Sequence, residues 1–234
     1  MGRFLNPDYS AFETALNSEI YIDKTGLLAY TNKVINTKQA FICNSRPRRF
    51  GKSVTADMLT AYYSKGCDSA DIFADYEISH AGDFRQHLNK YDVIHLDIQW
   101  CLAPAKGAAG VVSYIEKSVI AELKEKYPDI ILMADISNYE EGINAWKCGV
   151  DIVGTTMSGY TAYTSSVSDG PDYELMERLS RDINIPVIGE GRIHYPDQAV
   201  KALQTGAWAI VVGGAITRPL EIAMRFQNAI KESR

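Results

Sequence analysis

The stretch over residues 186–219, PVIGEGRIHYPDQAVKALQTGAWAIVVGGAITRP, constrains the fold of this chain most. Its pattern predicts a short apolar strand, a polar turn with Glu190 and Arg192, a helix, a second apolar strand, and Gly213-Gly214 before a last helix. Two strand-then-helix units precede it, with strands expected over 130–137 and 151–159. Short apolar strands that alternate with amphipathic helices indicate a parallel β/α architecture.

Four such units occupy residues 129–234, and part of this half recurs within it. At one constant offset, three positions carry the same residue: Ile136 and Ile193, Ala145 and Ala202, Gly149 and Gly206. A closed barrel of eight units needs about 250 residues. We therefore expect a (β/α)4 half of a TIM barrel here. Because a half-barrel has two unpaired edges, we also expect either that residues 1–128 cover them or that the chain forms a homodimer.

Glycines at the ends of the last two strands suggest a phosphate site. They leave backbone N–H groups uncovered beside a helix N-terminus, where a phosphate dianion is held well. Glu190 directly precedes Gly191 and is expected over the same mouth, which makes it a catalytic candidate. Two alternatives stay open: Gly213 and Gly214 serve only as turn residues, or Arg192 forms a salt bridge with Glu190.

In the first half, a helix is expected within residues 21–33, an apolar strand over 40–43, and a helix after Gly-Lys-Ser at 51–53. Strand, loop, Gly-Lys-Ser and helix form the pattern of a P-loop, in which Lys52 would hold phosphates and Ser53 would bind Mg²⁺. The match is imperfect, because Arg46 stands where the full motif has glycine. The alternative is a basic loop, with Arg46, Arg48 and Arg49, that caps a helix.

Four segments carry a resemblance: YIDKTGLL, RPRRFGKS, DIFADYEIS and YDVIHLDIQW. Over roughly residues 5–125 the chain resembles the bacterial AAA-ATPase-like family, whose core continues with further strands and sensor residues. The resemblance implies that Gly51, Lys52 and Ser53 bind ATP and Mg²⁺ and that Asp97 is the carboxylate of a Walker B strand. Alternatively, Asp97 ends a strand and caps the next turn.

The second half carries KEKYPDIILMADIS, GVDIVGTTMSGYT, GPDYELMERLS, NIPVIGEGRI and AWAIVVGGAITRP. These segments resemble the C-terminal half of the N-acetylmannosamine-6-phosphate 2-epimerase family of (β/α)8 enzymes. The resemblance implies cofactor-free interconversion of N-acetylmannosamine 6-phosphate and N-acetylglucosamine 6-phosphate in sialic acid catabolism. Glu190 would transfer a proton as a catalytic residue, and Asp135, also assigned as catalytic, would face the sugar. The implied substrate-binding residues are Thr155, Thr156, Gly191, Arg192, Gly213, Gly214 and Arg218. Alternatively, Asp135 only neighbours a helix cap supplied by Ser137 or Asn138.

The family's first four strands supply a catalytic lysine, and residues 1–128 show none of those strand motifs. We therefore predict an α/β protein in which a P-loop-like α/β N-terminal half (1–128) is joined to the half-barrel (129–234). The favoured function is the epimerase, with activity impaired by the missing half. The alternatives are a P-loop nucleotide-binding module and an inactive hybrid.

Composition excludes several classes. Hydrophobic residues make up 46% and charged residues 23%, as in ordinary globular proteins, and the net charge is −5. That balance lacks the basic excess of a nucleic-acid-binding protein. Neither a membrane span nor a signal peptide is expected, so we predict a cytoplasmic protein. Cys43, Cys67, Cys101 and Cys148 lie far apart and predict reduced thiols, and no metal site is expected apart from Mg²⁺ with ATP.

Overall fold

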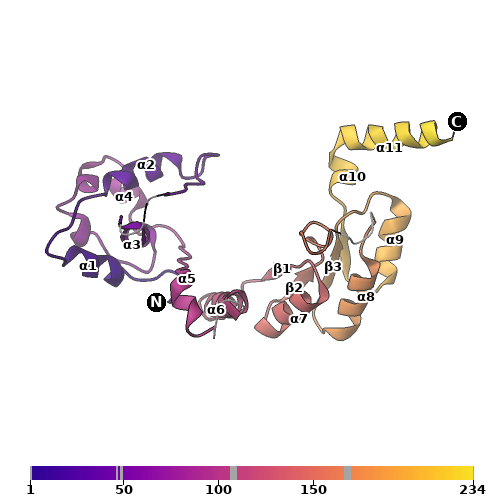
Figure 1. Ribbon diagram of the computed structural model, residues 1–234, viewed down its shortest axis with the longest axis horizontal. Coiled ribbons are helices and arrows are strands. Elements are labelled where there is room, and N and C mark those ends of the chain that lie inside the picture. Colours follow the sequence, from indigo (N-terminus) through magenta and orange to yellow (C-terminus); the bar gives the residue numbers. More distant parts are fainter. Residues whose placement is uncertain (1, 46, 48–49, 106–109, 166–169, 234) are drawn as a thin grey trace. The chain divides into compact units, whose positions relative to one another are not determined.

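The computed structural model describes residues 2–45, 47, 50–105, 110–165 and 170–233 (Figure 1). Arg46, Arg48 and Arg49 of the predicted basic loop therefore lie outside the described residues. The chain divides into two compact units, Met1–Pro104 and Ala105–Arg234. In the described part of the chain, no helix is both long and apolar enough to cross a membrane.

The first unit is built from helices around α3 (Lys52–Tyr63). Met58 and Tyr62 of α3 are buried at helical spacing. They share one apolar cluster with Phe12 and Phe73, whose rings stack at 5.4 Å between centroids. The other helices are α1 (Ser10–Leu16), α2 (Gly26–Val34), η1 (Asp71–Phe73), η2 (Glu77–His80), α4 (Phe84–His87) and α5 (Ile98–Leu102).

A buried polar network joins α2 to α3. Asn32 donates to the Tyr62 hydroxyl at 3.1 Å and accepts from the Tyr63 hydroxyl at 2.7 Å. The Tyr63 hydroxyl also lies 2.6 Å from Thr31 Oγ1, and the Tyr62 hydroxyl donates to the Phe84 carbonyl at 2.8 Å. Because a buried polar group without a partner is costly, this network fixes how the two helices meet.

The strand predicted over residues 40–43 is not formed, and neither is the strand that the resemblance implies before Asp97. Residues 40–43 have no strand, and Phe41 is 95% exposed. Residues 91–97 make only isolated bridges, antiparallel between Leu5 and Ile94 and parallel between Ser64 and Tyr91. An apolar strand is stable where neighbouring strands pair with it and cover its faces. The described residues of this unit offer no such sheet, and the strand predictions were wrong for that reason.

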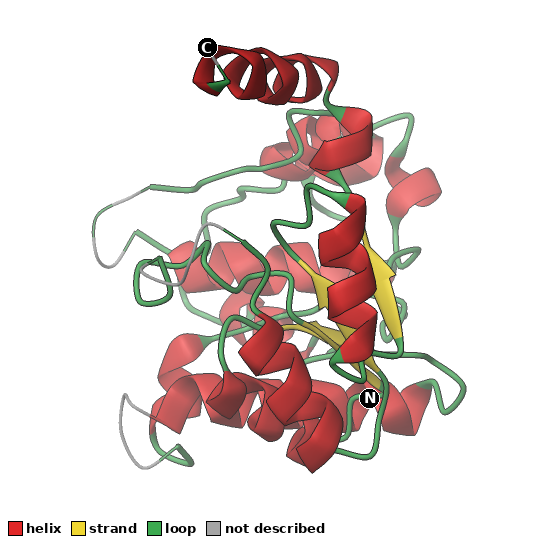
Figure 2. Ribbon diagram, turned by 90° about the vertical axis from the view of Figure 1, so that its right-hand side faces the viewer, coloured by secondary structure: helices red, strands yellow, loops and turns green. Residues whose placement is uncertain are grey.

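The second unit contains one parallel sheet in the order β1-β2-β3-β4. Its strands, yellow in Figure 2, are β1 (Met133–Asp135), β2 (Ile152–Gly154), β3 (Val187–Glu190) and β4 (Ala209–Val211). Asp135 pairs with Gly154, Gly154 with Ile188, and Glu190 with Val211. The predicted parallel β/α architecture is confirmed. The sequential strand order is the order of consecutive units in a β/α barrel.

Helices follow the strands in turn: α7 (Tyr139–Cys148), α8 (Tyr173–Asp182), α9 (Pro196–Gln204), α10 (Gly214–Thr217) and α11 (Pro219–Glu232). Buried Val153, Leu179 and Val187 form the core between sheet and helices. Gly149 and Gly206, which the internal repeat pairs, both have φ +95° after α7 and α9. Glycine adopts this left-handed conformation without strain, which explains why the same residue recurs at both helix ends.

Helix α6 (Val111–Lys126) lies in the second unit and packs on α7. Its apolar residues are only partly covered, since Val112 is 64% exposed. Only Val111 is buried within the helix, while Ile120 is half-buried against the core of this unit. These apolar residues therefore form the margin of the core.

Candidate functional site

The carboxyl end of the sheet brings together three of the predicted site residues. Asp135 is the last residue of β1, Glu190 is the last residue of β3, and Thr156 follows β2 between them. The Thr156 hydroxyl lies 2.9 Å from Asp135 Oδ1 and 3.2 Å from Glu190 Oε2. Two carboxylates are thus linked through one hydroxyl, an arrangement suited to general acid–base chemistry.

Thr155 fixes the backbone of Glu190 and is fully buried. Its hydroxyl donates to the Glu190 carbonyl at 2.8 Å and accepts from the Glu190 N–H at 3.0 Å. The Thr155 N–H also donates to the Ile188 carbonyl at 3.1 Å. Its side chain points into the strand pair, so Thr155 positions Glu190, whereas the resemblance had implied contact with the sugar.

Helix α7 takes its cap from Asn138, whose side chain accepts from the Glu141 N–H at 2.9 Å. Asp135 therefore stands near a helix cap, as one alternative held, but takes no part in it. Its side chain accepts a hydrogen bond from Thr156. Glu141 also accepts from the Tyr163 hydroxyl at 2.8 Å and ties the long loop after β2 to α7. Glu141 stands in an ordinary N-terminal turn of a helix, so no sequence pattern indicates its hydrogen bond to Tyr163.

The turn after β3 is left-handed at two successive residues, Gly191 with φ +101° and Arg192 with φ +58°. A non-glycine residue in this region is uncommon, and backbone strain of this kind clusters at active sites and ligand-binding loops. The Arg192 guanidinium lies against Gly159, where an added Cβ would come within 2.5 Å of Arg192 Cζ. Arg192 therefore reaches from the β3 turn to the loop after β2.

The predicted phosphate residues after β4 lie at the next carboxyl end along the sheet. Gly213 precedes α10, and no atom lies within 4 Å of the position its Cβ would take. Arg218 forms an ion pair with Glu221 at 2.8 Å, and its aliphatic part lies against Gly214. The space beside Gly213 is therefore uncovered, while the Arg218 side chain is turned toward Glu221 of α11.

A second set of predicted residues meets in the first unit. Lys52, Ser53 and Asp97 line one cavity of about 500 Å³. Gly51 borders a different cavity with Lys24 and has φ +74° as the residue before α3. Lys52 Nζ donates to the Pro47 carbonyl at 3.0 Å. Asp97 caps α5 by accepting a hydrogen bond from the Gln99 N–H at 2.8 Å, as the alternative interpretation expected. The same residue also lines the cavity with Lys52 and Ser53.

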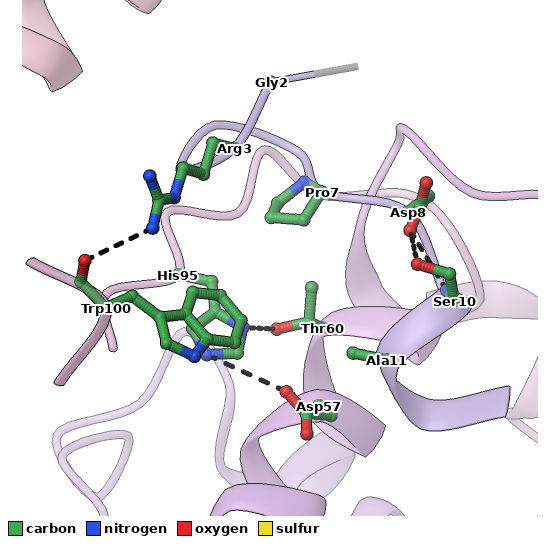
Figure 3. Close-up of a pocket in the computed structure, with 10 residues that line it drawn as sticks. All are labelled: Gly2, Arg3, Pro7, Asp8, Ser10, Ala11, Asp57, Thr60, His95 and Trp100. Carbon is green, nitrogen blue, oxygen red and sulfur yellow. Dashed lines mark hydrogen bonds and ion pairs between the residues drawn. The ribbon is translucent and has the colours of Figure 1, made fainter. Parts of the chain in front are cut away.

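Four residues of this region were missed by the sequence reasoning: Asp57, Thr60, His95 and Trp100. His95 Nδ1 lies 2.8 Å from Thr60 Oγ1, and its ring stacks on Trp100 (Figure 3). His95 Nε2 is 4.0 Å from Asp57 Oδ1, and both side chains are largely buried. Burial raises the pKa of the Asp57 carboxyl, a shift that His95 opposes. The available signal was the spacing of Ser53, Asp57 and Thr60, which places all three on one face of α3.

The described residues contain no cluster of three or more His, Cys, Asp or Glu side chains suited to a metal ion. All four cysteines are free, with Cys43 exposed and Cys101 buried. Burial raises the pKa of Cys67 and of Cys148. A raised thiol pKa disfavours the nucleophilic thiolate at these two positions.

Two family models match the chain. The model described as "Putative N-acetylmannosamine-6-phosphate epimerase" matches residues 108–232, and the one described as "Predicted AAA-ATPase" matches residues 9–142. Each match covers more than half of the chain, which therefore belongs to the epimerase family through its C-terminal part and to the AAA-ATPase-like family through its N-terminal part. Both resemblances stated from the sequence are confirmed.

Relatives of the C-terminal part are named "Putative N-acetylmannosamine-6-phosphate 2-epimerase". The one from Caldanaerobacter subterraneus subsp. tengcongensis is 60% identical over 115 residues, 49% of this chain and 48% of the relative. The one from Clostridioides difficile is 49% identical over 115 residues, 49% of this chain and 50% of the relative. A solved N-acetylmannosamine-6-phosphate 2-epimerase from Clostridium perfringens has 49% identity and a TM-score of 0.44, with 48% of each chain covered. The chain spans about half the length of the curated relatives it matches.

Proposed function

We propose that the chain binds a 6-phosphorylated N-acyl hexosamine at the carboxyl end of its sheet. There it would interconvert N-acetylmannosamine 6-phosphate and N-acetylglucosamine 6-phosphate. The observation that carries this proposal is the linked set of Asp135, Thr156 and Glu190, which lies within the segment that the epimerase family matches. Supporting it, the residues proposed for the phosphate, Gly191, Arg192, Gly213 and Gly214, follow the neighbouring strands β3 and β4. Arg218 joins them once its ion pair with Glu221 opens.

The chemistry needs proton transfer at C2. In the open-chain sugar the C2–H bond is adjacent to the C1 carbonyl, so a base can remove the proton while the electron pair delocalises into that carbonyl. Inversion then requires return of a proton to the opposite face. The reaction uses no cofactor, and a positioned base contributes about 10²- to 10⁴-fold. Glu190 is the proposed base, and Asp135 is the second carboxylate within reach of the same hydroxyl.

We further propose that turnover is slow. The resemblance assigns a second proton-transfer group, a lysine, to strands whose motifs residues 1–128 lack. With one face served, the enzyme would exchange the C2 proton with solvent faster than it inverts the centre.

Incubation of the sugar phosphate in deuterated water tests this proposal. Deuterium is expected at C2 before the epimer accumulates, and Glu190→Gln is expected to abolish the incorporation. Glu177→Gln, at an exposed position of α8, is the matched control. Equal incorporation in Glu190→Gln would remove Glu190 from the mechanism. Epimer formation as fast as deuterium incorporation would show that another residue supplies the second group.

A second candidate function rests on the cavity that gathers Lys52, Ser53 and Asp97. We propose that it binds ATP with Mg²⁺. An ammonium group, a hydroxyl and a carboxylate fit this ligand: Lys52 would contact phosphate, Ser53 would bind Mg²⁺, and Asp97 would hold water around the ion. The ion would neutralise phosphate charge. Gly51 and the N-terminus of α3 add backbone N–H groups beside the lysine.

Thermal stabilisation by ligands separates the two functions, since a ligand that binds the folded state raises its stability. ATP with Mg²⁺ should stabilise the protein, and Lys52→Ala should abolish that response without changing the response to the sugar phosphate. Lys33→Ala, at an exposed position of α2, is the control. An unchanged ATP response in Lys52→Ala would reject the nucleotide site. No response to either ligand would identify the chain as an inactive hybrid.

A further inference from the structure

We propose that Thr156 is a proton relay between Glu190 and Asp135, an inference that rests on the proposed epimerase function. The relay makes Asp135 a reservoir for the proton that Glu190 removes from the sugar. It also gives a role to a residue that the resemblance had placed only near the substrate.

The contacts of the hydroxyl carry the inference. Thr156 Oγ1 lies within hydrogen-bond distance of both Asp135 Oδ1, at 2.9 Å, and Glu190 Oε2, at 3.2 Å. A hydroxyl has one proton to donate and lone pairs with which to accept. Two ionised carboxylates can only accept, so they would compete for the single hydroxyl proton. Once one carboxyl group is protonated, Thr156 can accept a hydrogen bond from it and donate its own proton to the other carboxylate.

The backbone holds the three oxygen atoms in this order. Thr156 lies between two residues whose N–H groups donate to the neighbouring strand or loop, Thr155 to the Ile188 carbonyl and Met157 to the Ile136 carbonyl, each at 3.1 Å. Glu190 is fixed in turn by the buried Thr155 hydroxyl. The relay oxygen is therefore anchored on both sides, toward β3 and toward the end of β1.

The proposed step conserves every proton. Glu190 Oε2 takes the C2 proton, and the electron pair of the C–H bond passes into the C1 carbonyl of the sugar. The new Glu190 O–H then donates its proton to Thr156 Oγ1, while the original hydroxyl proton of Thr156 moves to Asp135 Oδ1. Thr156 ends as a neutral hydroxyl, Glu190 is again a carboxylate, and Asp135 holds the proton. Reversal of the same transfers returns it.

Two substitutions separate a relay from a structural role. Thr156→Val keeps the shape of the side chain and removes the hydroxyl, whereas Thr156→Ser keeps the hydroxyl. Thr205→Val is the matched control, because the Thr205 hydroxyl only donates to the Ala202 carbonyl at 2.7 Å before β4, away from the carboxyl end. The measurements are deuterium incorporation at C2 of N-acetylmannosamine 6-phosphate, the thermal shift with that sugar phosphate, and the melting temperature without ligand.

Thr156→Val is expected to slow deuterium incorporation about 10²-fold, the lower end for a positioned proton-transfer group, while the thermal shift stays as in the parent protein. Thr156→Ser is expected to restore incorporation, and Thr205→Val to leave it unchanged. Unchanged incorporation in Thr156→Val would overturn the relay and leave the epimerase proposal intact. Loss of the thermal shift in Thr156→Val, or failure of Thr156→Ser to restore incorporation, would reduce Thr156 to a binding or structural residue and also overturn the relay. No incorporation and no thermal shift in the parent protein would instead reject the epimerase function itself.

Discussion

The contact between α7 and α8 depends on a glycine facing a leucine, and its energetics can be tested directly. Leu179 of α8 is fully buried. A Cβ at Gly142 of α7 would lie 2.7 Å from Leu179 Cδ2 and 3.1 Å from its Cδ1. The absence of a side chain at Gly142 is therefore what allows the two helices to approach this closely around Leu179.

The structure sets the sign of three variants. Leu179→Ala removes buried methyl groups and should cost about 2–5 kcal/mol. Gly142→Ala gains about 1 kcal/mol of helix propensity but overpacks the leucine at a cost of about 1–3 kcal/mol, so it should be neutral to destabilising. In the Leu179→Ala background the steric clash is gone. There Gly142→Ala should stabilise the unit, and the double-mutant cycle should show a coupling of about 1–3 kcal/mol.

Urea unfolding followed by Trp146 fluorescence is a suitable assay, with Trp100 and Trp208 replaced by phenylalanine in every variant. Trp146 lies in α7, packs against the core of this unit and donates to Asn184 Oδ1 at 2.8 Å, so it reports the unfolding of the second unit. An equal effect of Gly142→Ala in both backgrounds, with coupling below about 0.5 kcal/mol, would refute the close approach of these helices.

Three further predictions follow from other parts of the chain. Asn32→Ala should destabilise the first unit by about 1–3 kcal/mol, because two buried tyrosine hydroxyls each lose a partner; chemical unfolding followed by Trp100 fluorescence measures it, and a neutral result would contradict the network. The Leu132 N–H and the Lys124 ammonium lower the pKa of Asp151, so its stabilising effect should be present above the unfolded-state pKa near 3.8 and disappear as the pH falls through the lower folded-state pKa. Asp151→Asn should therefore flatten the acid side of a melting-temperature profile, and an unchanged slope would count against that ion pair. The edge strands β1 and β4 each have one partner in the described sheet, so light scattering should detect a dimer at micromolar concentration; a monomer would argue against edge pairing.

The second unit could be predicted from the sequence because its signals are local. Apolar strands bounded by glycine, and helices with caps such as Asn138, specify their own positions. The carboxyl ends of parallel strands meet at one edge, so the proximity of Asp135 and Glu190 followed from topology. The hydroxyl link through Thr156 did not, because it depends on side-chain rotamers that the spacing of residues leaves open.

The first unit was harder because a strand is defined by its neighbours. Residues 40–43 have the composition of a strand, yet exposed Phe41 shows that composition is insufficient without a sheet to join. The helices of this unit did follow from periodicity, as α2 and α3 show. Asp57 and His95 lie far apart in the sequence, so no local pattern predicts that their side chains approach each other.

Helix α6 lies in the stretch of the chain where the two family matches overlap. Both family matches include it, since one begins at residue 108 and the other ends at residue 142. Its contacts, however, lie in the second unit: Lys124 pairs with Asp151 and donates to the Ile130 carbonyl at 2.9 Å, and Glu116 accepts from Asn144 at 2.9 Å. The boundary expected between residues 128 and 129 therefore falls within the second compact unit, which begins at Ala105. Helix α6 therefore belongs with the second unit, where it packs on α7.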